Sequence, residues 1–187
     1  MKLIQTIFVL IIFANTSFSQ TDSTKVIMTS DTNSITTVID TSLIINSVYN
    51  SALVMSDAFI GADYDVFITY THPKILEMTG GKEKMKEMLV KNIKPGTFLN
   101  LTLKKPLNII VTDSTIQCTM EQRQVMTIGG KKYFVIGTLI GITYNSGLNW
   151  YFVGASGNDL AALKIHFPEF SDELNIKVQT TPELVKD

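Results

Sequence analysis

The chain has 187 residues, of which 45% are hydrophobic and 18% are charged, and its formal net charge at pH 7 is -1. This near-neutral balance excludes the strong electrostatic attraction on which binding to nucleic acid or to an anionic membrane usually depends. A single cysteine, Cys118, excludes an intrachain disulfide, so an apolar core must stabilise the fold.

The first nineteen residues have the layout of a cleavable secretory signal peptide. Lys2 gives a positive start, the run from Leu3 to Phe13 is apolar, and Ser17 and Ser19 place small side chains before a cut at Gln20. The apolar run is shorter than the ~20 residues that span a bilayer as a helix. We therefore expect an exported protein, periplasmic or secreted, that is soluble after cleavage.

The rest of the chain divides into a lead-in and one domain. Residues 20–41 are rich in Ser, Thr and Asp, a composition that predicts a flexible segment. Residues 42–187 have the length of a single ordinary domain.

The first part of the domain has helical periodicity. Ser42 can cap a helix that ends at Gly61, and Asp63 can cap a shorter second helix. The short segment from Lys74 to Met78 is predicted as a strand, and a third helix starts after Gly81. The apolar stripe of the first helix consists of Ile44, Val48, Ala52, Met55 and Phe59.

After Pro95 the apolar residues repeat with a period of two, which is typical of strands. Turn residues such as Gly129 and Gly130 predict consecutive hairpins, and Asn158 or Asp159 can cap a last helix. The expected strands lie at 99–103, 107–111, 116–128, 133–144 and 148–155. This order predicts an α+β fold in which a curved antiparallel sheet wraps around N-terminal helices, with a helix at the C-terminal end.

With these elements, residues 45 to 167 resemble the NTF2-like superfamily, which includes SnoaL-like proteins and ketosteroid isomerases. The residues that carry the resemblance are Ala52, Asp57, Ala58 and Phe59, then Ala62, Asp63 and Tyr64, the segment Tyr70 to Pro73, and Trp150, Tyr151 and Phe152. The resemblance implies a cone-shaped fold with a pocket between sheet and helices. This superfamily hosts isomerases, dehydratases, transport adaptors and ligand binders, so the fold alone does not select a function.

The predicted turn also sets the register of the longest hairpin. If Gly129 and Gly130 are the two loop residues, residues whose numbers sum to 259 lie opposite each other. Gln122 and Gln124 then face the same side as Cys118, Met120, Met126, Tyr133, Val135 and Leu139. An unsatisfied buried amide costs ~1 to 3 kcal/mol, so these two side chains must bind each other, water or a ligand in the cone.

The opposite face of the hairpin is also apolar. It carries Phe134, Ile136, Ile140 and Ile142, a row too apolar to remain wholly in water. One face is therefore expected to pack the helices and the other to form the interface of a homodimer.

The predicted ligand pocket comprises Tyr64, Tyr70, His72, Gln122, Gln124 and Tyr133. The two histidines, His72 and His166, have no partner at a zinc-like spacing, so neither a metal nor another cofactor is expected. Asp57, Asp63 and Asp65 surround the first helical break, but none matches a family motif by position. Catalytic residues therefore stay unassigned.

Three functions are open at this point. The first is an exported, non-catalytic domain that binds a small apolar or amphipathic ligand, without nucleic acid or membrane as partner. The second is an isomerase or dehydratase that uses a carboxylate and a Tyr in the pocket. The third is a protein-interaction module that uses the sheet face. A Tyr and a carboxylate together in the cone would favour the enzyme, whereas a filled cone would favour the interaction module.

Overall fold

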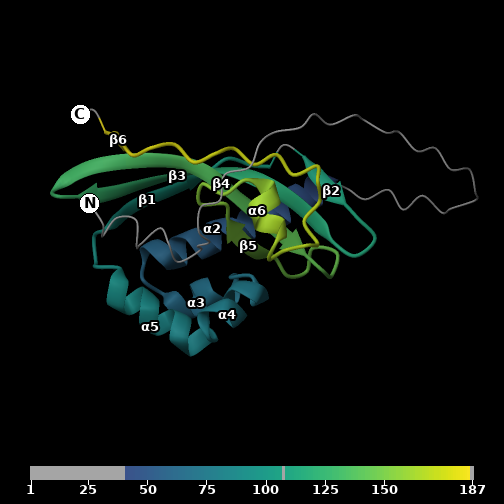
Figure 1. The fold of residues 1–187 in the computed structure, drawn as a ribbon, viewed down its shortest axis with the longest axis horizontal. Coiled ribbons are helices and arrows are strands. Elements are labelled where there is room, and N and C mark those ends of the chain that lie inside the picture. The colour runs from purple at the N-terminus through teal and green to yellow at the C-terminus, as the bar shows by residue number, and fades with distance from the viewer. Residues whose placement is uncertain (1–40, 107, 186–187) are drawn as a thin grey trace, which may run out of the picture.

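The computed structural model describes residues 41–106 and 108–185, so the predicted signal peptide and residues 20–40 of the lead-in lie outside the described residues. These residues form an α+β fold with an open, curved antiparallel sheet (Figure 1). The helices are α2 (Thr41–Ile60), α3 (Tyr64–Thr69), α4 (Pro73–Thr79), α5 (Lys82–Asn92) and α6 (Leu160–Lys164). The strands are β1 (Phe98–Leu103), β2 (Ile109–Val111), β3 (Ile116–Ile128), β4 (Lys131–Thr143), β5 (Tyr151–Gly154) and β6 (Glu183–Leu184).

Local sequence signals account for the helix boundaries. The side chain of Asp63 caps α3 by accepting a hydrogen bond from the Val66 N–H at 3.2 Å, and Asp159 caps α6 in the same way. The predicted stripe of α2 is confirmed, because Ile44, Val48, Ala52 and Met55 are all buried and Phe59 is half-buried. The amphipathic pattern therefore orients α2 against the sheet.

Among the described helices, α2 is the one that is long and apolar enough to cross a membrane by length and composition. It lies near the N-terminal end of the described residues. In this fold, however, its buried stripe packs against β-strand residues such as Cys118 and Leu139, as in the core helix of a globular domain.

The strand predicted from Lys74 to Met78 is wrong, because these residues form most of helix α4. Pro73 occupies the first turn, where its missing N–H has no cost. The His72 side chain caps this end by accepting a hydrogen bond from the Lys74 N–H, and Gly80 ends the helix in the left-handed conformation at φ 89°. The segment is thus bounded by helix signals on both sides.

The sheet has the order β1-β3-β4-β5, with β2 also paired to β3 and β6 to β4. The β3–β4 pairing runs from Ile116 opposite Thr143 to Ile128 opposite Lys131, which confirms the predicted register. Gly129 and Gly130 have φ values of 57° and 78°, as a type I′ turn requires.

The face of this hairpin that carries the glutamines packs against α2. Cys118, Met120 and Leu139 share one core cluster with the α2 stripe. The closest approach is at Gly141, where an added Cβ would lie 2.9 Å from Cγ2 of Val48. Glycine is therefore needed there to let the helix approach the strand.

The opposite face is covered by the chain's own C-terminal part, so the expectation that all helices lie on one face is wrong. Ile140 and Ile142 are 0% exposed and share a core cluster with Leu163 of α6 and with Phe167. Because Ile140 and Ile142 are buried within the chain, they cannot belong to a dimer interface, and the predicted dimer face is wrong for these two of its four residues. The other two, Phe134 and Ile136, are half-buried, and the Arg123 guanidinium lies 4.4 Å from the Phe134 ring centre.

Residues 175–185, called the C-terminal strap below, continue along the edge of β4 that β5 leaves unpaired. The Thr138 hydroxyl donates to the Lys177 carbonyl at 3.1 Å, the Thr180 N–H to the Ile136 carbonyl at 2.9 Å, and the Val185 N–H to the Lys132 carbonyl at 3.0 Å. Figure 1 shows this yellow trace along the border of the sheet, on the side away from α3, α4 and α5. The strap thus satisfies an edge that would otherwise be open to pairing with another chain.

Candidate functional site

A cavity of about 140 Å³ lies between the sheet and helices α2, α4 and α5. Its wall is mostly apolar and includes Met55 and Phe59 from α2, Leu89 from α5, Leu101 from β1 and Leu139 from β4. An apolar cavity of roughly 150 Å³ can hold a benzene molecule, so the space fits a single ring or the end of a short chain. Half-buried lining residues such as Ile93 and Phe98 show where the cavity approaches the surface.

Gln122 and Gln124 line this cavity, as their place in the register predicts. The Gln124 Nε2–H donates a hydrogen bond to Oε1 of Gln122 at 2.7 Å. Gly137, opposite Gln122, has no side chain, and Gln179 of the strap reaches over it with Cγ 3.7 Å from where a Cβ would lie. Carboxamides from β3 and the strap therefore form part of the polar wall, and the other polar lining residues are Ser56, Thr71, Asn92, Thr138 and Ser156.

None of the described residues that line the cavity has an ionisable side chain. The lining thus contains no carboxylate, imidazole, phenol, thiol or amine that could transfer a proton or attack a substrate. It also contains no charge that could neutralise a buried ion.

The four other residues of the predicted pocket are not among those that line the cavity. Tyr64 is buried in α3, and burial raises the pKa of its phenol. Tyr70 follows α3 and is half-buried, and Tyr133 lies near the start of β4 opposite Leu184. The structure therefore brings together the two glutamines and separates them from the tyrosines.

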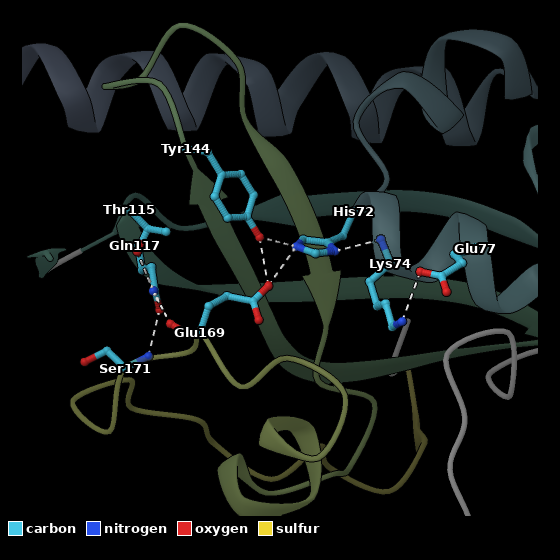
Figure 2. A network of polar contacts seen from close by, with 8 residues as sticks. All are labelled: His72, Lys74, Glu77, Thr115, Gln117, Tyr144, Glu169 and Ser171. Carbon is cyan, nitrogen blue, oxygen red and sulfur yellow. Dashed lines mark hydrogen bonds and ion pairs between the residues drawn. The ribbon is translucent and has the colours of Figure 1, made fainter. Parts of the chain in front are cut away.

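The fourth residue, His72, belongs to a separate polar network (Figure 2). Its Nδ1 accepts the hydrogen bond of the Lys74 N–H at 3.1 Å, so the neutral ring carries its proton on Nε2. This Nε2–H donates to Oη of Tyr144 at 2.8 Å, and the Tyr144 hydroxyl donates to Oε1 of Glu169 at 2.8 Å. One chain of donors and acceptors thus joins the start of α4, the end of β4 and the segment after α6.

The ionisation states in this network follow from burial. His72 is 3% exposed, and burial lowers its pKa while the Glu169 carboxylate partly opposes this shift. For Tyr144, burial and the hydrogen bond to Glu169 raise the pKa well above its ordinary range. A neutral imidazole and a neutral phenol bonded to a carboxylate form a structural clamp, since Tyr144 cannot act as a phenolate.

Gln117 binds the backbone of Glu169 and Ser171, so it holds the same segment after α6 as the Tyr144 contact does (Figure 2). It is fully buried, and its Nε2 donates to Oγ1 of Thr115 at 2.7 Å and to the Glu169 carbonyl at 2.8 Å. Its Oε1 accepts from the Ser171 N–H at 2.9 Å. These bonds hold residues 169–171 on the face of β3 opposite the cavity.

The single thiol is not a candidate nucleophile. Cys118 is fully buried, and burial raises its pKa to about 12. Among the described residues, no three His, Cys, Asp or Glu side chains are grouped so that they could hold a metal ion.

Sequence reasoning missed Tyr144 and Glu169 as partners of His72 and Gln179 as part of the cavity wall. His72 and Tyr144 are 72 positions apart, and no spacing rule connects them. Gln179 follows the last predicted element; the alternation of Ile176 and Val178 with Lys177 and Gln179 was a signal for a strand, but it does not identify β4 as the partner.

No known protein-family model, curated protein or solved structure matches this chain. What the protein does must therefore be inferred from the cavity and the residues around it.

Proposed function

We propose that this protein is an exported, non-catalytic domain of the NTF2-like type that binds a small neutral ligand between its sheet and its helices. The observation that carries this proposal is the apolar cavity of about 140 Å³ with two bonded glutamines in its wall. Ligand sites typically combine an apolar wall with a few placed polar groups that orient the ligand. The cavity has this composition.

The NTF2-like assignment is supported by the arrangement of elements. A curved antiparallel sheet holds α2 against one face, and the space between them is only partly filled. Export is supported by the sequence layout of residues 1 to 19, with its positive start, apolar run and small residues before Gln20.

The composition of the cavity favours binding over proton transfer. An isomerase of this superfamily needs a carboxylate base and hydrogen-bond donors inside an apolar pocket. Here the Tyr144 and Glu169 pair lies outside the cavity lining, and the described lining residues are all uncharged. The open space also favours a ligand over a role limited to the sheet surface, where homodimerisation through Phe134 and Ile136 stays a prediction.

Filling the cavity tests the proposal. We expect Leu101→Trp to abolish the rise in melting temperature that small neutral aromatic molecules, such as toluene or indole, cause in the original protein. Leu101 lines the cavity, so a Trp there occupies the ligand's space. The measurement is thermal unfolding with ligand in excess; at 100 times Kd, binding stabilises by about 2.7 kcal/mol.

Leu99→Trp is the matched control, because Leu99 lies on the same strand, is exposed and does not line the cavity. It should keep the full response to ligand. An original protein that responds to none of these molecules, or two variants that respond equally, would contradict the proposed function.

A further inference from the structure

We propose that the ligand is a neutral molecule about the size of one ring that carries a hydrogen-bond donor and acceptor side by side, as in a carboxamide or a lactam. Gln122 and Gln124 bind this group. The inference rests on the binding function proposed above and names the chemical class that the cavity selects.

The lack of charge in the wall excludes ionic ligands. An ion moved from water into apolar surroundings without a partner loses several kcal/mol of hydration. The two charged residues of β3 beside the glutamines, Glu121 and Arg123, alternate to the other face of the strand, where Glu121 pairs with Lys104 at 2.6 Å and Arg123 lies over the Phe134 ring. Neither a carboxylate nor an ammonium group would therefore find a counter-charge inside the cavity.

The two glutamines have hydrogen-bonding capacity left over. Their mutual bond uses one N–H of Gln124 and the carbonyl of Gln122, so the Gln122 amide N–H groups and the Gln124 carbonyl have no partner among the described residues. No described buried side-chain nitrogen or oxygen is left unsatisfied, so these free atoms must have access to open space, and the cavity is the space that both side chains border. If the nitrogen and oxygen of both side-chain amides are interchanged, the pair still has one amino group and one carbonyl oxygen that bind no other residue.

Three hydroxyl groups of the wall already donate to backbone carbonyls and do not compete for the ligand's polar group: Ser56 to Ala52 at 2.7 Å, Thr71 to Phe67 at 3.4 Å and Thr138 to Lys177 at 3.1 Å. The other polar side chains of the lining, Asn92, Ser156 and Gln179, are half-buried and come from other parts of the chain. The glutamine pair is the place where two bonded amides of the lining offer a donor and an acceptor side by side. A carboxamide can accept from Gln122 and donate to Gln124 with two adjacent atoms, while its ring fills the apolar part.

Three probes of similar size test the inference by calorimetry and thermal unfolding. Benzamide is neutral and has the donor and acceptor, toluene has neither, and benzoate has the same shape as benzamide with a negative charge at pH 7. We expect benzamide to bind at least tenfold more tightly than toluene, and benzoate to give no shift in melting temperature.

Gln122→Met and Gln124→Met remove the amides and keep most of the side-chain volume. Each variant should bind toluene as the original protein does and should lose the preference for benzamide. Asn100→Met is the control, because Asn100 is an exposed amide on the neighbouring strand β1 that does not line the cavity, so this variant should keep the preference. If a variant does not fold, the comparison of probes on the original protein decides alone.

The outcomes separate the two proposals. Equal binding of toluene and benzamide, or binding of benzoate as tight as that of benzamide, overturns the assigned ligand class and leaves the binding function intact. Failure of every probe overturns the binding function itself.

Discussion

At the scale of single residues, the best-predicted part of the site is the glutamine pair. Strand alternation and the turn at Gly129 and Gly130 together decide which face Gln122 and Gln124 occupy, and both are local signals. The position of His72 depends on contacts with residues 72 or more positions away, for which the sequence has no rule. Local periodicity therefore identified the cavity wall but not the clamp.

His72 makes the stability of the fold depend on pH. Its native pKa lies below the ordinary value of 6.5, so the unfolded chain takes up a proton at a higher pH than the folded chain does. We expect the free energy of unfolding to fall as the pH decreases below about 6.5 and to level off below the native pKa. The groups that face His72 are Tyr144, Tyr151 and Glu169, and the Glu169 carboxylate 3.5 Å away reduces this loss without reversing it.

Urea unfolding at pH 7.5, 6.5 and 5.5 measures this dependence. His72→Gln should remove this part of the pH dependence, while His166→Gln serves as the control that changes the other histidine. An identical slope in the original protein and in His72→Gln would show that His72 does not contribute.

At the scale of elements, α4 shows why a short apolar segment is ambiguous. The five residues from Lys74 to Met78 fit a strand or one turn and a half of helix, and periodicity cannot separate these over so few positions. The deciding signals flank the segment, with Pro73 at the first turn and Gly80 at the end. The longer elements, such as α2 and the β3–β4 hairpin, were predicted because their periodic patterns extend over many residues.

The contact between α2 and β4 leads to a prediction for two glycines of one strand. Gly141→Ala should destabilise the fold by about 1 to 3 kcal/mol, because its Cβ would lie 2.9 Å from Val48 Cγ2 and 3.2 Å from Phe152 Cε1. Gly137→Ala is the control, since its Cβ meets only the flexible Gln179 side chain at 3.7 Å. Urea unfolding of both variants checks this, and equal stability of the two would contradict the close packing of α2.

At the scale of the whole molecule, the sequence showed that both faces of the hairpin need cover but not what covers them. The row of Phe134, Ile136, Ile140 and Ile142 is apolar and needs to be buried. A second subunit or the chain's own C-terminal part could bury it equally well. The structure places α6 and Phe167 over Ile140 and Ile142. In the strap, Ile176 and Val178 alternate with Lys177 and Gln179, as in a strand, but so short a pattern does not indicate that its partner is β4.

Removing the strap should weaken the fold and open the cavity. A chain that ends at Asn175 loses the bonds of Lys177 and Thr180 to β4, each worth about 0.5 to 1.5 kcal/mol, and exposes part of the sheet edge. We expect a loss of about 2 to 5 kcal/mol in unfolding free energy and faster release of bound toluene. A chain that ends at Thr181 keeps these bonds and is the control; if both truncated chains behave like the full chain, the strap has no stabilising role.

The position of the strap also determines when the binding space is completed. The β3–β4 hairpin closes through a two-residue turn and can form within microseconds, whereas Thr180 pairs with Ile136 across 44 positions of sequence. A chain that emerges from a ribosome or a translocation channel therefore forms its sheet first and gains the last wall only after residue 180 is free. We expect a ligand present during folding to meet a cavity that is still open along β4, while a ligand added later enters a cavity whose wall at Gln179 is already in place.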